Sequence, residues 1–203
     1  MQLEGNMTTP SEIVKFWLNV IGREKWYVAD DSVDGAIRER YLPAWEEARD
    51  GALNGWTSTA EGSFAFVILT DQFPRNMFRE QGEAFSTDEM ALSASREAIC
   101  KNWDLNMAEP ERQFFYLPFM HSESLADQDE CIRLIGARMP ETGGENLIHA
   151  HAHREVIRLF GRFPYRNEAL GRESADGEKA YIADGGYAST LAKIRNGAAP
   201  LFS

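Results

Sequence analysis

Nine polar side chains follow apolar segments directly or lie on the inward stripe of an expected helix, where groups that bind a ligand commonly occur. They are Asp71, Arg75, Asn76, His121, Glu123, His153, Arg162, Arg166 and Asn167. Arginine forks suit carboxylate or phosphate, amides fix orientation, and histidines can serve as acid or base. We therefore expect one polar cleft between helices that binds a small anionic molecule or a peptide carboxylate.

The histidines have alternative interpretations. His153 precedes Ile157 by four residues and Phe160 by seven, so it faces the interior. There it either forms a hydrogen bond with a backbone carbonyl or borders a polar cleft. His121 with Glu123 and Glu111 suits acid/base chemistry; the alternative is that they are solvated residues at helix ends.

A metal site is the less favoured interpretation of the histidine-rich segment. Glu145, His149 and His153 would share a helix face, but a third strong ligand is not guaranteed. The sequence has no HExxH, GxSxG, CxxC or glycine-rich phosphate loop. We expect neither metal nor cofactor. Cys100 and Cys131 form no spaced pair and are expected to be thiols in a reducing compartment.

Capping signals place the first helices. Thr9-Pro10-Ser11-Glu12 predicts a helix start and Gly22 its end, and a second helix is expected from Asp31 or Ser32 to Gly51. Ser58-Thr59-Ala60-Glu61 opens a third, buried helix. Pro74 is expected to end this helix near Phe73, so that Arg75 and Asn76 enter a loop.

Further helices are expected along the rest of the chain. They begin near Asp88 and Glu109, cover about 124–138 and 145–160, and follow Ser174 and Ser189. No segment alternates with the period of a strand, so the fold class is predicted to be all-α. The length suits a single domain, assigned to residues 9–203 after a flexible head of residues 1–8.

Composition excludes several classes of protein. With 43% hydrophobic and 26% charged residues the chain is typical of globular proteins. A net charge of −11 repels phosphate backbones, so nucleic acid is not an expected partner. No apolar run approaches the roughly 20 residues of a membrane span, and residues 1–10 lack the pattern of a signal peptide. The expected location is the cytoplasm; the oligomeric state is not indicated.

Three separated motifs, in order, carry a family resemblance. They are Leu69-Thr70-Asp71-Gln72-Phe73-Pro74-Arg75-Asn76, Tyr116-Leu117-Pro118-Phe119-Met120-His121-Ser122-Glu123, and His153-Arg154 followed by Phe160-Gly161-Arg162-Phe163-Pro164-Tyr165-Arg166-Asn167. The sequence resembles the bacterial family catalogued as domain of unknown function 924. The resemblance implies an all-α, tetratricopeptide-like fold without a settled activity: an irregular array of about seven to nine helices packed as antiparallel hairpins.

Three functions remain open from the sequence. The first is the anion-binding cleft. The second is a tetratricopeptide-like adaptor that binds a protein segment, in which the motif residues are internal staples. The third is a hydrolase that uses His and Glu acid/base chemistry. Whether the protein is an enzyme is left open.

Overall fold

The computed structural model describes residues 7–197. The chain divides into two compact units, Met1–Asn106 and Met107–Ser203, each of which has its own helices. The assignment of residues 9–203 to a single domain stays a prediction. Residues 1–6 of the predicted flexible head lie outside the described residues.

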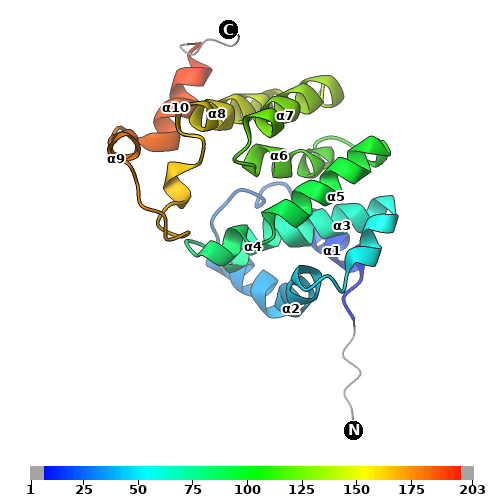
Figure 1. Ribbon diagram of the computed structural model, residues 1–203. Helices are drawn as coiled ribbons and strands as arrows, with labels where there is room; N and C mark the ends of the chain where they lie inside the picture. The colour runs from blue at the N-terminus through cyan, green and yellow to red at the C-terminus, as the bar shows by residue number, and fades with distance from the viewer. Residues whose placement is uncertain (1–6, 198–203) are drawn as a thin grey trace. The chain divides into compact units, whose positions relative to one another are not determined.

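The first unit is built from helices joined by short 3-10 segments (Figure 1). Its α-helices are α1 (Pro10–Lys15), α2 (Asp31–Arg49), α3 (Ala60–Val67), α4 (Phe73–Met77) and α5 (Asp88–Cys100). Two π-helical turns, η1 (Phe16–Ile21) and η3 (Ile68–Gln72), continue α1 and α3, and the 3-10 segments are Asn54–Ser58, Gly82–Phe85 and Trp103–Asn106. Helix α3 packs against both α1 and α5, so it forms the centre of this unit.

The predicted caps are confirmed for α1 and α3. Thr9 accepts a hydrogen bond from the Glu12 N–H, and the Glu12 carboxylate accepts the Thr9 N–H at 2.8 Å. Thr59 caps α3 through the Gly62 N–H at 3.1 Å. Helix α2 begins at Asp31, one of the two predicted positions, and the Asp30 side chain caps it by accepting the N–H groups of Ser32 and Val33. These side chains satisfy donors that the helix itself leaves unpaired.

The prediction that Arg75 and Asn76 lie in a loop is wrong, because both lie in α4. The chain widens into the π turn η3, in which the Phe73 N–H donates to the Ile68 carbonyl five residues earlier. Pro74 then occupies the first turn of a new helix, where its missing N–H costs no hydrogen bond. The π turn therefore lets the chain stay helical past a proline.

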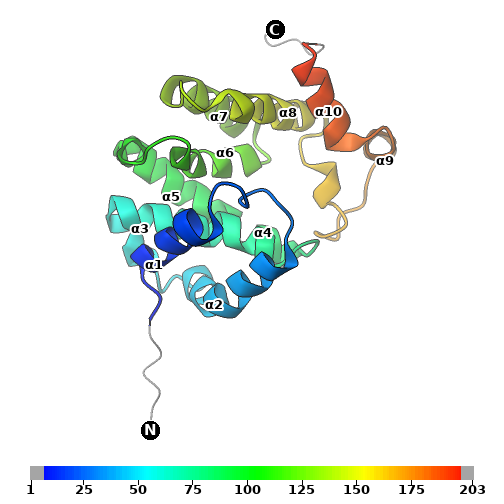
Figure 2. The ribbon, with the colours of Figure 1, turned by 180° about the vertical axis from the view of Figure 1, so that it is seen from behind.

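The second unit consists of two short helical segments followed by longer helices. Its elements are 3-10 Glu111–Phe115, α6 (Leu117–His121), α7 (Leu125–Arg138), α8 (Gly144–Phe160), 3-10 Pro164–Arg166, α9 (Asp176–Ala183) and α10 (Gly186–Arg195). Helices α7 and α8 form an antiparallel hairpin and lie side by side in both views (Figures 1 and 2). Helix α10 runs antiparallel along α8, since Arg195 near its end bonds Glu145 near the start of α8 at 2.6 Å.

The all-α prediction is confirmed. Residues 7–197 contain no strand, and seven of their α-helices have eight or more residues. Two element predictions need correction: the segment after Glu109 forms a 3-10 turn before α6 rather than one helix, and α10 begins at Gly186, before Ser189. Within the described part of the chain, no helix is both long and apolar enough to cross a bilayer. The tetratricopeptide-like comparison stays a prediction.

Candidate functional site

The end of α6 positions His121 and Glu123. Gln128, which is fully buried on α7, donates its side-chain N–H groups to the carbonyls of Met120 and Ser122 at 2.7 and 2.8 Å. A third contact, at 3.3 Å, reaches the carbonyl of Phe119. These bonds satisfy carbonyls that a helix end leaves unpaired. His121 closes the helix and Glu123 follows two residues later, so both start from a fixed backbone.

A glycine turn directs the next polar residues back toward α6. Gly161 ends α8 with φ of 69°, in the left-handed region that favours glycine, and its N–H donates to the Ile157 carbonyl at 2.8 Å. Arg162, Phe163 and the 3-10 turn Pro164–Arg166 follow. The Phe163 side chain is fully buried against Val156 and Ile157, which anchors this segment on α8.

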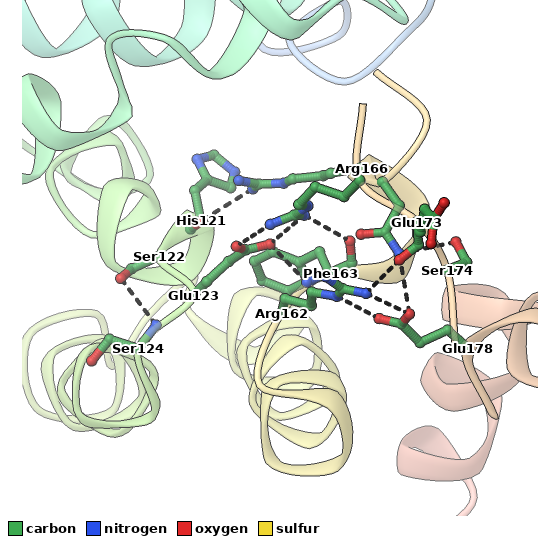
Figure 3. Close-up of polar contacts among 12 residues, drawn as sticks. His121, Ser122, Glu123, Ser124, Arg162, Phe163, Arg166, Glu173, Ser174 and Glu178 are labelled. Atoms are coloured by element: carbon green, nitrogen blue, oxygen red, sulfur yellow. Dashed lines mark hydrogen bonds and ion pairs between the residues drawn. The ribbon is translucent and has the colours of Figure 1, made fainter. Parts of the chain in front are cut away.

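Arg162 forms a two-pronged ion pair with Glu178 of α9 (Figure 3). Its Nε and Nη2 atoms lie 2.7 Å from the two carboxylate oxygens, and Nη2 also donates to the Glu173 carbonyl at 2.8 Å. Glu178 further accepts from Asn167 Nδ2 at 3.3 Å and from the Ala175 N–H at 2.7 Å. The Arg162 hydrogen bonds, followed by those of Ala175 and Asn167, lower the pKa of Glu178 to about 2.

Arg172 holds Glu123 in a second fork. Its Nη1 and Nη2 atoms lie 2.7 and 2.9 Å from the two carboxylate oxygens, and the Phe163 N–H donates to the same carboxylate at 2.8 Å. Burial alone would raise the pKa of Glu123. The hydrogen bonds from Arg172 and Phe163, with the charges of Arg172 and Arg166, outweigh burial and hold this pKa below its usual value. Glu123 therefore connects α6 to the segment after α8 as a carboxylate.

The Arg166 guanidinium and the His153 imidazole both pack against the Phe163 ring. The Arg166 Cζ atom lies 4.6 Å from the ring centroid, and the His153 ring centroid lies 5.4 Å from it in an edge-to-face arrangement. Arg166 Nη2 donates to the His121 carbonyl at 3.0 Å, and the His121 and His153 rings are 6.5 Å apart. We call Phe163, Arg166, His121 and His153 the Phe163 cluster. Stacking on an aromatic face fixes the plane of the guanidinium.

Tyr187 of α10 connects two histidines of α8. Its hydroxyl lies 2.6 Å from His149 Nδ1 and 3.2 Å from His153 Nδ1. His153 Nδ1 also lies 2.9 Å from the His149 carbonyl. Burial, chiefly, and the nearby charges of His121 and Arg166 lower the pKa of His153 to about 3, against a raising contribution from the hydrogen bond to that carbonyl. His153 is therefore uncharged at neutral pH.

The remaining three predicted site residues belong to the first unit. Asp71 is fully buried in η3; its Oδ1 lies 3.2 Å from Arg75 Nη1, and its Oδ2 accepts from Gln72 Nε2 at 2.5 Å. Arg75 also pairs with Asp88 of α5, with Nη1 and Oδ1 2.9 Å apart. Asn76 donates instead to Asp34 of α2, at 2.8 Å, and so helps to join α4 to α2.

The structure thus brings Asp71 and Arg75 together in the first unit. In the second unit it connects a larger group: His121, Glu123, His153, Arg162, Arg166 and Asn167. That all nine residues line one cleft stays a prediction.

Sequence reasoning missed three residues of the second unit: Arg172, Glu178 and Tyr187. Arg172 carried a signal, since it follows Arg162 and Arg166 in an arginine-rich segment, residues 154–172, that contains no lysine. Glu178 lies at the third position of an expected helix, where an acidic side chain is common because it caps the helix, so its presence did not indicate an ion pair with Arg162. No sequence feature indicated that Tyr187 contacts His149 and His153.

The partners of Glu145 and His149 bear on the metal interpretation of the histidine-rich segment. Among residues 7–197 no three His, Cys, Asp or Glu side chains are arranged to hold a metal ion. Glu145 bonds Arg195, and His149 Nδ1 bonds Tyr187. These partners occupy two of the three groups in the histidine-rich segment.

Comparison with known proteins places the chain among relatives whose activity is not described. No curated protein matches it. A solved structure of a protein of unknown function from Agrobacterium tumefaciens is 39% identical, with a TM-score of 0.81 over 87% of this chain and 97% of that chain. The model of the bacterial family of unknown function DUF924 matches residues 13–186, and the chain therefore belongs to this family.

Proposed function

We propose that the protein binds a small anionic molecule at the Phe163 cluster. One observation carries the proposal: the Phe163 ring holds a guanidinium 4.6 Å and an uncharged imidazole 5.4 Å from its centroid. A guanidinium over an aromatic ring is a directional anion-binding group, and its field is stronger where water is excluded. Of the nine predicted residues, Arg166, His153 and His121 are the ones that we assign to the ligand.

Arg162 and Arg172 serve the fold under this proposal. Arg162 and Arg172 each hold a carboxylate of the same chain through two short contacts. Glu123, Glu178 and Asn167 accordingly fix the backbone that carries Phe163 and Arg166.

A thermal-shift screen against acetate, propionate, succinate, citrate and inorganic phosphate tests this proposal. A ligand that binds only the native state stabilises it by about 2.7 kcal/mol at a hundredfold its Kd. We compare the wild type with Arg166→Lys, which keeps the charge but loses the planar fork. Arg158→Lys is the control for the substitution itself, because Arg158 is paired with Glu155 on the exposed face of α8.

The expected result is an anion that stabilises the wild type and Arg158→Lys but not Arg166→Lys. Stabilisation that persists in Arg166→Lys, or no stabilisation of the wild type by any of the five anions, contradicts the proposal. The measurement at neutral pH is appropriate because His153 is then uncharged.

A second candidate is the adaptor, in which the motif residues are staples and the helices bind a protein segment. The internal forks of Arg162 and Arg172 favour it. The same screen discriminates the two candidates, because the adaptor predicts no stabilisation by any anion. The low pKa of Glu123 does not support a hydrolase in which this residue donates a proton near neutral pH.

A further inference from the structure

Helix α10 is attached to α8 with little buried surface. Within Gly186–Arg195, all of which the structure describes, Thr190 is the one buried side chain. The junction with α9 contains two consecutive glycines, Gly185 and Gly186, whose φ values of 91° and 53° lie in the left-handed region that favours glycine. Few buried apolar contacts are typical of the parts of a fold that open at the lowest free energy. Helix α10 is therefore a segment that can separate from α8 by itself.

Tyr187 makes the polar contacts at one end of the interface between α8 and α10. Its hydroxyl lies 2.6 Å from His149 Nδ1 and 3.2 Å from His153 Nδ1, and its ring centroid lies 4.7 Å from that of His153. At the other end Arg195 pairs with Glu145, but these side chains are 47% and 69% exposed. Such an exposed ion pair contributes little. The hydrogen bonds of Tyr187 are therefore the partly buried polar connection between the two helices.

These hydrogen bonds fix where the hydrogen atoms lie. The His149 carbonyl oxygen accepts only, and it lies 2.9 Å from His153 Nδ1, so this nitrogen carries a hydrogen. His153 Nδ1 therefore cannot accept the hydroxyl hydrogen of Tyr187. That hydrogen points to His149 Nδ1, which accepts it only when unprotonated. The contact between α10 and His149 thus requires an uncharged His149 ring with its hydrogen on Nε2.

Protonation of His149 removes this acceptor. Two N–H groups then face the Tyr187 oxygen, and the hydroxyl hydrogen has lost its partner. Burial, first, and the charge of Arg195 lower the pKa of His149, whereas the charge of Glu145 raises it. The attached helix therefore disfavours the imidazolium, and a released α10, which leaves His149 in water, binds the proton more tightly.

The other helices that pack against α8 leave His149 as the group that titrates. Among the described residues, the charges that act on its pKa are those of Arg195 and Glu145. On α7, Asp129 pairs instead with Arg154, and on α6 the His121 ring lies 6.5 Å from that of His153.

His153 has a pKa of about 3 and stays uncharged in the folded chain at pH 5.5. The protonation of this interface in mildly acidic solution is therefore that of His149.

We propose that the contact between His149 and Tyr187 is a pH-sensitive switch: protonation of His149 releases α10 from α8 while the rest of the second unit stays folded. Release also removes the Tyr187 ring from the His153 ring. The attached state is favoured above the pKa of His149 in the released chain, near 6.5, and loses stability as the pH falls below it. The proposal does not depend on anion binding at the Phe163 cluster.

Amide hydrogen exchange of the full chain, followed by NMR at pH 7.5 and 5.5 without any ligand, tests this proposal. Protection factors are corrected for the intrinsic pH dependence of exchange, and those of α10 are divided by those of α7 in the same sample. The α7 amides report unfolding of the whole unit, so the ratio isolates the release of α10. Protonation of a group with a pKa near 6.5 favours the released helix by at most about tenfold over this range, so the ratio should fall by about twofold to tenfold.

Two variants assign the effect to His149. His149→Asn keeps an acceptor near the position of Nδ1 but cannot be protonated, so its ratio should be equal at the two pH values to within about twofold. His151→Asn is the matched control: it also removes a partly buried histidine of α8 whose pKa is lowered by burial, but His151 points to another face of the helix. The ratio of His151→Asn should fall as in the wild type.

Several results would overturn the proposal. A wild-type fall smaller than about twofold would do so, as would a fall that persists in His149→Asn. Amides of α10 that exchange together with those of α7 at both pH values would show that α10 is not released separately. If His149→Asn does not fold, an NMR titration of the wild-type His149 ring replaces it: a pKa below 6.5 supports the proposal, and a pKa of 6.5 or above contradicts it.

Discussion

Replacing Glu178 by alanine should destabilise the second unit by about 2–3 kcal/mol. Glu178 is buried and accepts hydrogen bonds from Arg162, Asn167 and the Ala175 N–H. Removing one partner of a buried ion pair costs roughly 3–5 kcal/mol, because the other charge is left without compensation. The Arg162 side chain is 31% exposed, so it regains water and the cost falls below that range.

Glu155→Ala is the matched control. Glu155 holds Arg158 through two contacts of 2.7 Å, the same geometry as the Arg162 fork. The Arg158 side chain is 50% exposed and only three residues away on the same helix. Such a pair contributes about 0.5 kcal/mol or less. Both variants remove one carboxylate and its two-pronged ion pair. The difference between their losses of stability therefore measures the effect of burial and of the contact between α9 and the segment after α8.

Urea unfolding at pH 7, followed by circular dichroism and tryptophan fluorescence, measures both losses. The five tryptophans are Trp17, Trp26, Trp45, Trp56 and Trp103, all in the first unit, so fluorescence reports that unit and circular dichroism reports both. We expect Glu178→Ala to shift the dichroism transition clearly more than Glu155→Ala. Losses equal to within about 0.5 kcal/mol would refute the reasoning that Glu178 joins α9 to the end of α8.

Three further predictions concern single side chains. Thr87→Val removes a buried hydroxyl that donates to the Thr70 carbonyl at 2.6 Å and accepts from the Trp45 indole at 3.2 Å. Unfolding followed by fluorescence should show that the free energy of unfolding falls by about 2–3 kcal/mol. A decrease of less than about 0.5 kcal/mol would contradict this. Gly62→Ala would place a Cβ atom 2.1 Å from the Trp56 carbonyl oxygen, whereas a Cβ atom at Gly55 would meet no atom within 4 Å. Only Gly62→Ala should therefore lower the Tm strongly. Equal Tm values for Gly62→Ala and Gly55→Ala would contradict the close packing at the start of α3. The pKa of His153 is about 3 in the folded chain and near 6.5 in the unfolded chain, so the stability linked to this residue is fully present above pH 6.5 and is lost as the pH falls toward 3. Between pH 7 and 5.5 the free energy of unfolding of the wild type should fall by about 1 kcal/mol more than that of His153→Phe. Identical losses would contradict an uncharged His153 ring in the folded state.

Helix starts could be predicted because their causes are local. The Thr9 box with Glu12 needs four consecutive residues and no tertiary contact. The buried α3 followed from its cap and an apolar run. The π turn η3 could not be predicted, because a five-residue hydrogen bond carries no sequence signature and depends on the packing around Phe73. Pro74 therefore indicated a helix end where the chain in fact begins another helix.

The arginine forks show why the candidate site could be predicted only in part. The sequence correctly located a cluster of arginines after α8, and arginine there does bind carboxylate. It could not show that the carboxylates come from the chain itself, since Glu178 lies 16 residues after Arg162 and Glu123 lies 49 residues before Arg172. Both pairings depend on the turn at Gly161, which reverses the chain, and on the packing of Phe163 against α8. A pattern of charges along a sequence predicts the kind of partner, whereas tertiary packing decides whether that partner is a ligand or another residue of the same protein.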